Sequence, residues 1–297
     1  MLQGNITKAL KYVDSDSVIS GVHTVDKNVL KTLKLKHPTA QPLIEECLVE
    51  ESANTVQPVI FEEIDSELIY QLAKKATGSG GPSKVDSEHW KHILCNKSYG
   101  NVSVQLCQSI ADVTKRLCQE EVSTACVHHL LSCRLIPLKK DTSGVRPIGI
   151  GEMLRRLMAK AVVKVLQNDI QQAAGPLQTC AGLDGGIEAT IHAMSKAYHD
   201  TTSEALLLVD ADNAFNSLNR ANALKNIQSL CPPFYNFLNN TYKSPSKMYV
   251  SNSEEVILSQ EGTTQGDPDA MHMYAISTRP IIDQLHEVCD TSVTKQC

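Results

Sequence analysis

Two aspartates stand at the end of a short apolar run, in the sequence Leu206-Leu-Leu-Val-Asp-Ala-Asp212. Four apolar residues followed by acid predict a buried strand whose carboxyl end opens into a cleft. A carboxylate in that position is held rigidly. Since Mg²⁺ takes hard oxygen ligands in near-octahedral geometry, Asp210 and Asp212 are candidate metal ligands.

This acidic pair is compatible with three kinds of chemistry, and with a solvated strand end that has none. Phosphatases of the haloacid dehalogenase type use Asp-x-Asp but carry Thr or Val two residues after the second Asp, where Ala214 stands here. Glycosyltransferases that use nucleotide sugars also carry Asp-x-Asp. In a polymerase palm, one Asp is followed five residues later by an aromatic residue, and Phe215 occupies that position. Its ring would lie under the sugar of an incoming nucleotide and would select deoxynucleotides by clashing with a 2′-hydroxyl.

A second motif, Gln265-Gly-Asp-Pro268, follows about fifty residues later, directly before a predicted helix. Gly266 allows close approach of a ligand to the backbone, and Pro268 suits the first turn of a helix. The Gln265 amide offers both a donor and an acceptor to a nucleotide or a template base. Taken alone, the motif is more typical of an ordinary turn that starts a helix.

A third feature is a basic segment that reads as a β-hairpin. Residues 134–140 and 145–150 are strand-like, and Asp141-Thr-Ser-Gly144 is a turn. From Leu131 to Lys164 the net charge is +6, which leaves −11 on the remainder of a chain whose total is −5. Arg146 can grip a triphosphate bidentately, and Lys139 or Lys140 can act as a point charge. A solvated basic face is the simpler interpretation, and we expect it for Arg155 and Arg156, which lie on an amphipathic helix.

Further elements must position these motifs. Hydrophobic periodicity predicts helices over 65–75, 101–119, 152–166, 187–198, 218–230 and 269–288, and a second hairpin from 247–250 and 256–259. Residues 76–83 form a glycine-rich loop that lacks the Gly-Lys-Ser/Thr of a phosphate-binding loop. Residues 1–57 are an irregular lead-in. The pattern predicts an α/β (α+β) protein with a helix-rich N-terminal half.

Composition narrows the class of protein further. The 297 residues contain 4% aromatics, too few for many base-stacking platforms, and no apolar run is long enough for a membrane helix. The start lacks a secretory pattern, so we expect an intracellular protein, nuclear or cytoplasmic, with no membrane partner. None of the ten cysteines forms Cys-x-x-Cys. Cys126, His128, His129 and Cys133 are a weak candidate for zinc, and buried free thiols are the better interpretation.

With these motifs in order, the chain from about Gly78 to its end resembles a reverse transcriptase of a non-long-terminal-repeat or related animal retroelement, that is, a retrotransposon RNA-directed DNA polymerase. The resemblance rests on Arg-Leu-Ile-Pro-Leu-Lys-Lys-Asp, Gly-Val-Arg-Pro-Ile-Gly-Ile, Asp-Ala-Asp-Asn-Ala-Phe-Asn-Ser-Leu-Asn-Arg and Glu-Gly-Thr-Thr-Gln-Gly-Asp-Pro. It implies a right-hand fold, with a fingers-like region over 58–200 that holds the hairpin 134–150, and a partial palm over 201–297. It also implies a nucleotidyltransferase that uses two Mg²⁺ ions, an RNA template, a DNA primer and dNTPs.

The resemblance assigns roles residue by residue. Asp210 is the catalytic metal-binding carboxylate, and the main-chain carbonyl of Ala211 is a further metal ligand. Phe215 is the sugar gate, and Gln265 with Gly266 forms the nucleotide and template loop. Arg146, with Lys139 or Lys140, holds the triphosphate. Asp212 is a neighbour in the site and not a metal ligand in the family pattern.

Departures from the family pattern qualify these expectations. Asp269 stands where an aliphatic residue is usual, and His272 where a small one is usual, which hints at sequence decay. The aromatic-Ala-Asp-Asp motif and the thumb are absent, so we expect a fragment that is inactive as this chain. A non-catalytic RNA-binding remnant that uses the basic hairpin is the alternative, followed by an Asp-x-Asp phosphatase or glycosyltransferase.

Overall fold

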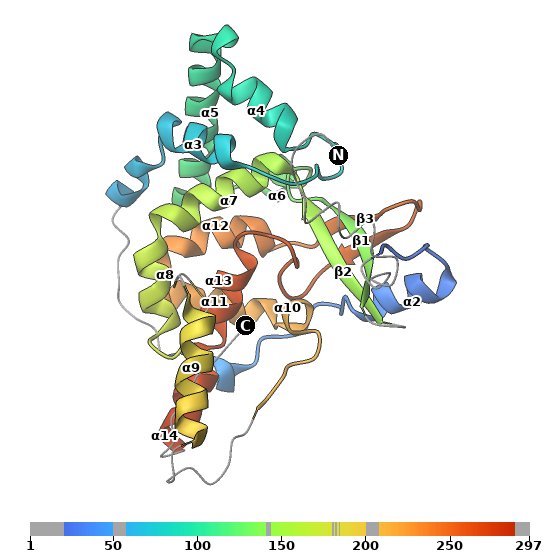
Figure 1. Ribbon diagram of the computed structural model, residues 1–297, viewed down its shortest axis with the longest axis vertical. Coiled ribbons are helices and arrows are strands. Elements are labelled where there is room, and N and C mark those ends of the chain that lie inside the picture. Colours follow the sequence, from blue (N-terminus) through green and yellow to red (C-terminus); the bar gives the residue numbers. More distant parts are fainter. Residues whose placement is uncertain are drawn as a thin grey trace.

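A computed structural model describes residues 21–49, 58–140, 144–179, 181, 183, 185–199 and 208–288. These residues form a mixed α/β structure with a single four-stranded sheet. Most of the helices gather beside this sheet (Figure 1). Among these described residues, no helix combines the length and the apolarity needed to cross a membrane.

Helices make up most of the described structure, together with short 3₁₀ turns at Glu45–Cys47, Pro58–Glu63 and Lys97–Tyr99. The α-helices are α2 (Lys27–Leu35), α3 (Ser66–Lys75), α4 (Ser87–Cys95), α5 (Asn101–Gln119), α6 (Thr124–Val127), α7 (Met153–Val165), α8 (Gln167–Ala174), α9 (Gly186–His199), α10 (Ala214–Ser217), α11 (Arg220–Leu230), α12 (Pro232–Tyr242), α13 (Ala270–Ser277) and α14 (Arg279–Val288).

The sheet is built from two hairpins. Its strands are β1 (Cys133–Lys140), β2 (Gly144–Gly151), β3 (Ser246–Val250) and β4 (Val256–Ser259), in the order β2-β1-β3-β4. Each hairpin is antiparallel, and β1 pairs with β3 in parallel. The predicted hairpins are both confirmed, although the turn residues 141–143 of the first lie outside the described residues. The basic strand β2 is left at one edge of the sheet.

Two apolar clusters hold these elements together. In the first, one face of the sheet packs against α2 through Leu135, Val145 and Met248 on the strands and Leu33 on the helix. The second cluster lies among α3, α5, α7, α11, α12 and α13 and includes the fully buried rings of Phe234 and Phe237. The helix α7 begins two residues after β2 ends, so only Glu152 separates the basic hairpin from the helical cluster.

The six helical ranges predicted from periodicity are all helical in the structure, whereas α4, α6, α8, α10 and α12 were not predicted. Two further expectations differ from the structure. The helix predicted over 269–288 is two helices, α13 and α14, because α13 ends at Ser277, Thr278 caps it, and Pro280 lies in the first turn of α14. The lead-in expected to be irregular contains α2, whose first turn is capped by the Asp26 carboxylate accepting a hydrogen bond from the Val29 amide.

Candidate functional site

The register of the basic hairpin separates its two candidate lysines. Leu138 pairs with Arg146, and alternate residues of a strand share a face, so Lys140 lies on the same face as Arg146. Lys139 lies on the opposite face, and its amide donates a hydrogen bond of 2.9 Å to the Gly21 carbonyl. All three basic side chains are exposed. Of the two lysines, Lys140 is therefore the one that can act together with Arg146.

The loop that follows β4 lies along the free edge of β2. The Gly149 amide donates a hydrogen bond of 3.0 Å to the carbonyl of Gln265. Gly266 has φ +114°, and a Cβ on it would lie 2.7 Å from the Gly149 carbonyl oxygen. A Cβ on Gly149 would in turn collide with the Thr264 side chain. Glycine is thus required on both sides of this contact, which joins the second sequence motif to the third.

Phe215 belongs to the same assembly. It lies on the short helix α10, and its carbonyl accepts a hydrogen bond of 2.7 Å from the amide of Thr263. Gly262, at φ +64°, approaches this carbonyl so closely that a side chain would not fit. The half-buried Phe215 ring lies 5.3 Å from the ring of Tyr274 on α13, centroid to centroid. The structure therefore brings together Phe215, the glutamine–glycine loop and the basic hairpin.

The acidic segment differs from its prediction. Residues 208–211 form no strand, and Leu208 and Val209 are 81% and 84% exposed, where burial was expected. Residues 206–207 lie outside the described residues. A strand needs a neighbour for its main-chain hydrogen bonds, and the described sheet does not include this segment. Asp210 and Ala211 are likewise exposed, and within the described chain no hydrogen bond or ion pair joins them to the loop or the hairpin.

The donor set at this segment fits a divalent metal only in part. The exposed carboxylates of Asp210 and Asp212 and the carbonyl of Ala211 are hard oxygen donors of the kind that Mg²⁺ takes. Over the described ranges, however, no three acidic, histidine or cysteine side chains gather to hold an ion.

A buried ionic cluster beneath the loop was not predicted. Arg155 of α7 was expected to be solvated, but this is wrong, because its side chain is 4% exposed and forms ion pairs with Asp267 and Asp269, the latter at 3.4 Å. The hydroxyl of Tyr242 donates to the same two carboxylates, at 3.0 and 3.4 Å. Asp269 is completely buried, and its pairing with Arg155 gives this departure from the family pattern a structural role.

Burial and mutual charge set the ionisation of this cluster. Burial raises the pKa of Asp269 to about 6; Arg155 acts against the rise, and Asp267 adds to it. Burial alone would lower the pKa of Arg155, but the two carboxylates outweigh it and hold that pKa well above the usual value. The guanidinium is therefore charged at any ordinary pH, and the cluster stays ionic near neutrality.

A second buried arginine fixes the start of the same loop. The Arg220 guanidinium donates to the carbonyls of Gly262 (3.0 Å), Ser259 (3.1 Å) and Glu261 (2.9 Å), and its amide donates to the Glu261 carboxylate at 2.6 Å. Burial lowers the pKa of Arg220 to about 10, so it is charged at neutral pH. The Tyr242 ring lies near both guanidiniums, 5.3 Å from Arg220 and 5.8 Å from Arg155. Two buried arginines thus hold the loop at both ends.

The sequence did contain a signal for Arg155. It stands three and seven residues before Met158 and Val162, so a 3.6-residue period places it on the buried face of α7. A charge on an apolar face requires a buried partner of opposite sign. The neighbouring Arg156 is half-buried and donates to the carbonyls of Thr77 and Ser79 in the glycine-rich loop.

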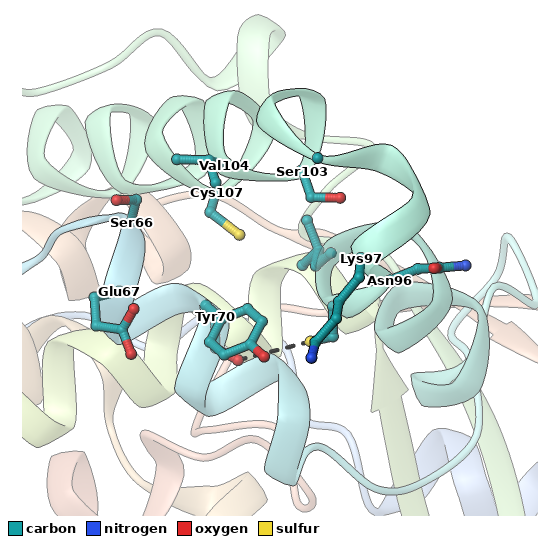
Figure 2. Close-up of a pocket in the computed structure, with 11 residues that line it drawn as sticks. Ser66, Glu67, Tyr70, Asn96, Lys97, Ser103, Val104 and Cys107 are labelled. Carbon is teal, nitrogen blue, oxygen red and sulfur yellow. Dashed lines mark hydrogen bonds between the residues drawn. The ribbon is translucent and has the colours of Figure 1, made fainter.

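A separate cavity lies between α3, α4 and the start of α5, away from these motifs. Its volume is about 290 Å³, and Figure 2 shows Glu67, Tyr70, Lys97 and Cys107 around it. None of the candidate site residues lines it. Burial raises the pKa of Cys107 to about 11, so this thiol is protonated and unreactive at neutral pH.

The other cysteines agree only in part with the expectation of buried free thiols. Cys118, Cys133 and Cys231 are free and buried, as Cys107 is. Cys126 is exposed on α6, whereas Cys133 lies on the buried face of β1. The two thiols therefore do not share a helix face, and the expectation of burial is wrong for Cys126.

Comparison with known proteins gives no relative from which to transfer a function, since no protein-family model and no curated protein matches the chain.

Proposed function

We propose that this chain is part of an RNA-directed DNA polymerase of the reverse transcriptase kind, comprising fingers and part of a palm. One observation carries the proposal: the Gln265–Gly266 loop lies on the edge of the basic hairpin while Thr263 of the same loop binds the main chain of Phe215. The loop thus contacts the other two motifs, so that the residues selected from the sequence for a nucleotide's template contact, triphosphate and sugar belong to one assembly. The phosphatase and glycosyltransferase readings explain neither the loop nor the hairpin.

Each group has a distinct part in the proposed reaction. The primer 3′-hydroxyl attacks the α-phosphate of a dNTP, and pyrophosphate leaves. Arg146 and Lys140 neutralise the triphosphate from one face of the hairpin, and the Phe215 ring restricts the 2′ position of the sugar. Asp210, with the Ala211 carbonyl, would hold Mg²⁺, which activates the attacking hydroxyl and neutralises the leaving group when bound.

Nucleotide binding by the chain tests this proposal. Arg146→Ala and Lys140→Ala each remove a charged contact worth about 1.5 kcal/mol, so each should weaken dNTP binding roughly tenfold, as measured by fluorescence titration. Lys139→Ala removes the same charge from the opposite face of the same strand and should change the affinity little. Phe215→Val should raise the affinity for NTPs towards that for dNTPs. Equal effects of Lys139→Ala and Lys140→Ala, or unchanged sugar discrimination, would contradict the proposed site.

A second candidate, a non-catalytic RNA-binding module, is favoured by the composition of the sheet. None of the residues in the four strands is acidic. The face that carries Lys140 and Arg146 also carries Lys247 and the exposed ring of Tyr249. Binding through phosphate contacts alone predicts a steep salt dependence of RNA affinity, with no response to dNTP or Mg²⁺. Filter binding at two salt concentrations, with and without dNTP, separates the two candidates.

A further inference from the structure

Residues 36–49 form an exposed segment that leaves α2 and runs towards α11 (Figure 1). We call this segment the strap. Its side chains contribute little to its position, because residues 39–47 are all exposed, and Leu43 and Ile44 are 41% and 46% exposed. Something other than apolar burial therefore holds the strap in place.

Asparagines on one face of α11 bind the main chain of the strap. The Asn222 amide accepts from the Ile44 amide at 2.8 Å and donates to the Ile44 carbonyl at 2.6 Å. One turn later, Asn226 accepts from the Val49 amide at 3.1 Å and donates to the Cys47 carbonyl at 2.9 Å. Both asparagine side chains are buried, and each accepts one main-chain hydrogen bond from the strap and donates one to it.

A third asparagine, at the N-cap of α11, also binds the strap. The cap residue Asn219 donates to the Pro42 carbonyl at 2.7 Å. Positions 219, 222 and 226 are three and four residues apart, so they lie on one face of the helix. Every one of these contacts ends on a main-chain atom, so this face binds the backbone of the strap and not its side chains. Ile44 and Leu48 are extended, and the residues between them form the short 3₁₀ turn Glu45–Cys47.

The strap also touches both segments that frame Phe215. Asn213, two residues before Phe215, donates to the Lys36 carbonyl at 2.9 Å. The Gln41 amide donates to the carboxylate of Glu261, which also accepts from the Arg220 amide. The strap thus contacts Asn213, directly after the acidic segment, and Glu261 at the start of the loop.

We propose that the asparagine face of α11 is a binding site for a peptide recognised by its main chain, with extended residues on either side of a short 3₁₀ turn, and that the strap is its resident and removable ligand. An amide side chain that pairs with the N–H and C=O of one residue accepts any residue except proline. The proposal does not depend on the polymerase assignment, since it concerns how this chain binds its own segment.

Amide hydrogen exchange in the full chain tests the first half of the proposal. Asn222→Ala with Asn226→Ala should accelerate exchange at Ile44 and Val49 at least about tenfold, whereas Gln228→Ala, on the exposed face of α11, should leave both unchanged. Leu43→Ser with Ile44→Ser should change the rates by less than about twofold. Release of the strap by the serine changes, or its retention after the asparagine changes, would overturn main-chain recognition.

A peptide added in trans tests the second half. Ile44→Pro removes the main-chain N–H that donates a hydrogen bond to Asn222, and it should free the strap in the full chain. A labelled peptide of residues 39–49, carrying Cys47→Ser, should then bind the Ile44→Pro chain saturably, at least about tenfold tighter than the unmodified chain. A peptide with its other residues scrambled around Pro42 should bind comparably. Absence of binding to the Ile44→Pro chain would show that the strap is a fixed part of the fold and overturn the proposed binding site.

Discussion

The loop 261–269 and the segment 208–212 both carry residues that the sequence singles out, yet their surroundings are opposite. The loop is held by Arg155 at one end and Arg220 at the other, both buried. The acidic segment is exposed along its whole length, and within the described chain no hydrogen bond or ion pair orients the Asp210 carboxylate. One half of the candidate site is fixed by buried contacts of the fold, and the other half has no such contacts among the described residues.

This contrast separates two kinds of functional residue. Gln265 and Gly266 are positioned by buried charges and by glycines in close contact, so changes far from a ligand should displace them. Asp210 has no such support, and changing it should alter ligand binding without altering the fold. Stability measurements can therefore tell the two regions apart before any activity is known.

Removing the arginine beneath the loop should have the largest effect. Arg155→Met leaves the buried Asp267 and Asp269 without a cation, and breaking a buried pair in this way costs about 3 to 5 kcal/mol of unfolding free energy. Urea denaturation measures this loss. Adding Asp267→Asn and Asp269→Asn to the same chain should recover part of it, because no uncompensated charge then remains.

Arg156→Met is the matched control, one position along the same helix. Arg156 is half-buried and donates only to the carbonyls of Thr77 and Ser79, so we expect a loss of about 1 kcal/mol. If the Arg155 and Arg156 variants lost the same free energy of unfolding, the buried ion pairs of Arg155 would not be what holds the loop in place.

The pH dependence of stability sharpens the same contrast, with a smaller effect. Burial raises the pKa of Asp269 from 3.8 to about 6 in the folded chain. The folded state then holds this proton more tightly than the unfolded state does, so the free energy of unfolding falls as pH rises from about 4 to about 6. Asp269→Asn removes the titration and should flatten the profile in that window. Parallel profiles of the two chains in urea denaturation from pH 4 to 7 would contradict this assignment.

Local sequence patterns predicted both hairpins and part of the helices, but not the buried polar partners of these elements. Short-range periodicity predicted the helix over 101–119 with the observed bounds, whereas α4, α8 and α12 were not predicted. The partners of Arg155 lie 112 and 114 residues away, a pairing that no local pattern encodes. The face of Lys139 and Lys140 required the register, since a strand's alternation is known only relative to its neighbour.

The acidic segment shows a different limit of sequence reasoning. Leu208 and Val209 have the composition of a strand, but a strand forms only where a neighbour accepts its hydrogen bonds, and the described sheet does not supply one. The strap was missed for the opposite reason. Its own sequence has no period, and its position depends on asparagines of α11 that local patterns treat as unfavourable in a helix.

Asp210→Ala should have the smallest effect on stability and the clearest effect on chemistry. Because the carboxylate is exposed and unpaired within the described residues, its removal should change the free energy of unfolding by about 0.5 kcal/mol or less. In a longer reading frame that contains an Ala-Asp-Asp motif, the same change should abolish primer extension on poly(rA)/oligo(dT), since the metal clamp loses a ligand. Asp212→Ala, two residues away and equally exposed, should retain most extension. A large loss of stability for Asp210→Ala would show that the segment is already part of a built site, and equal extension by both variants would remove Asp210 from its proposed role.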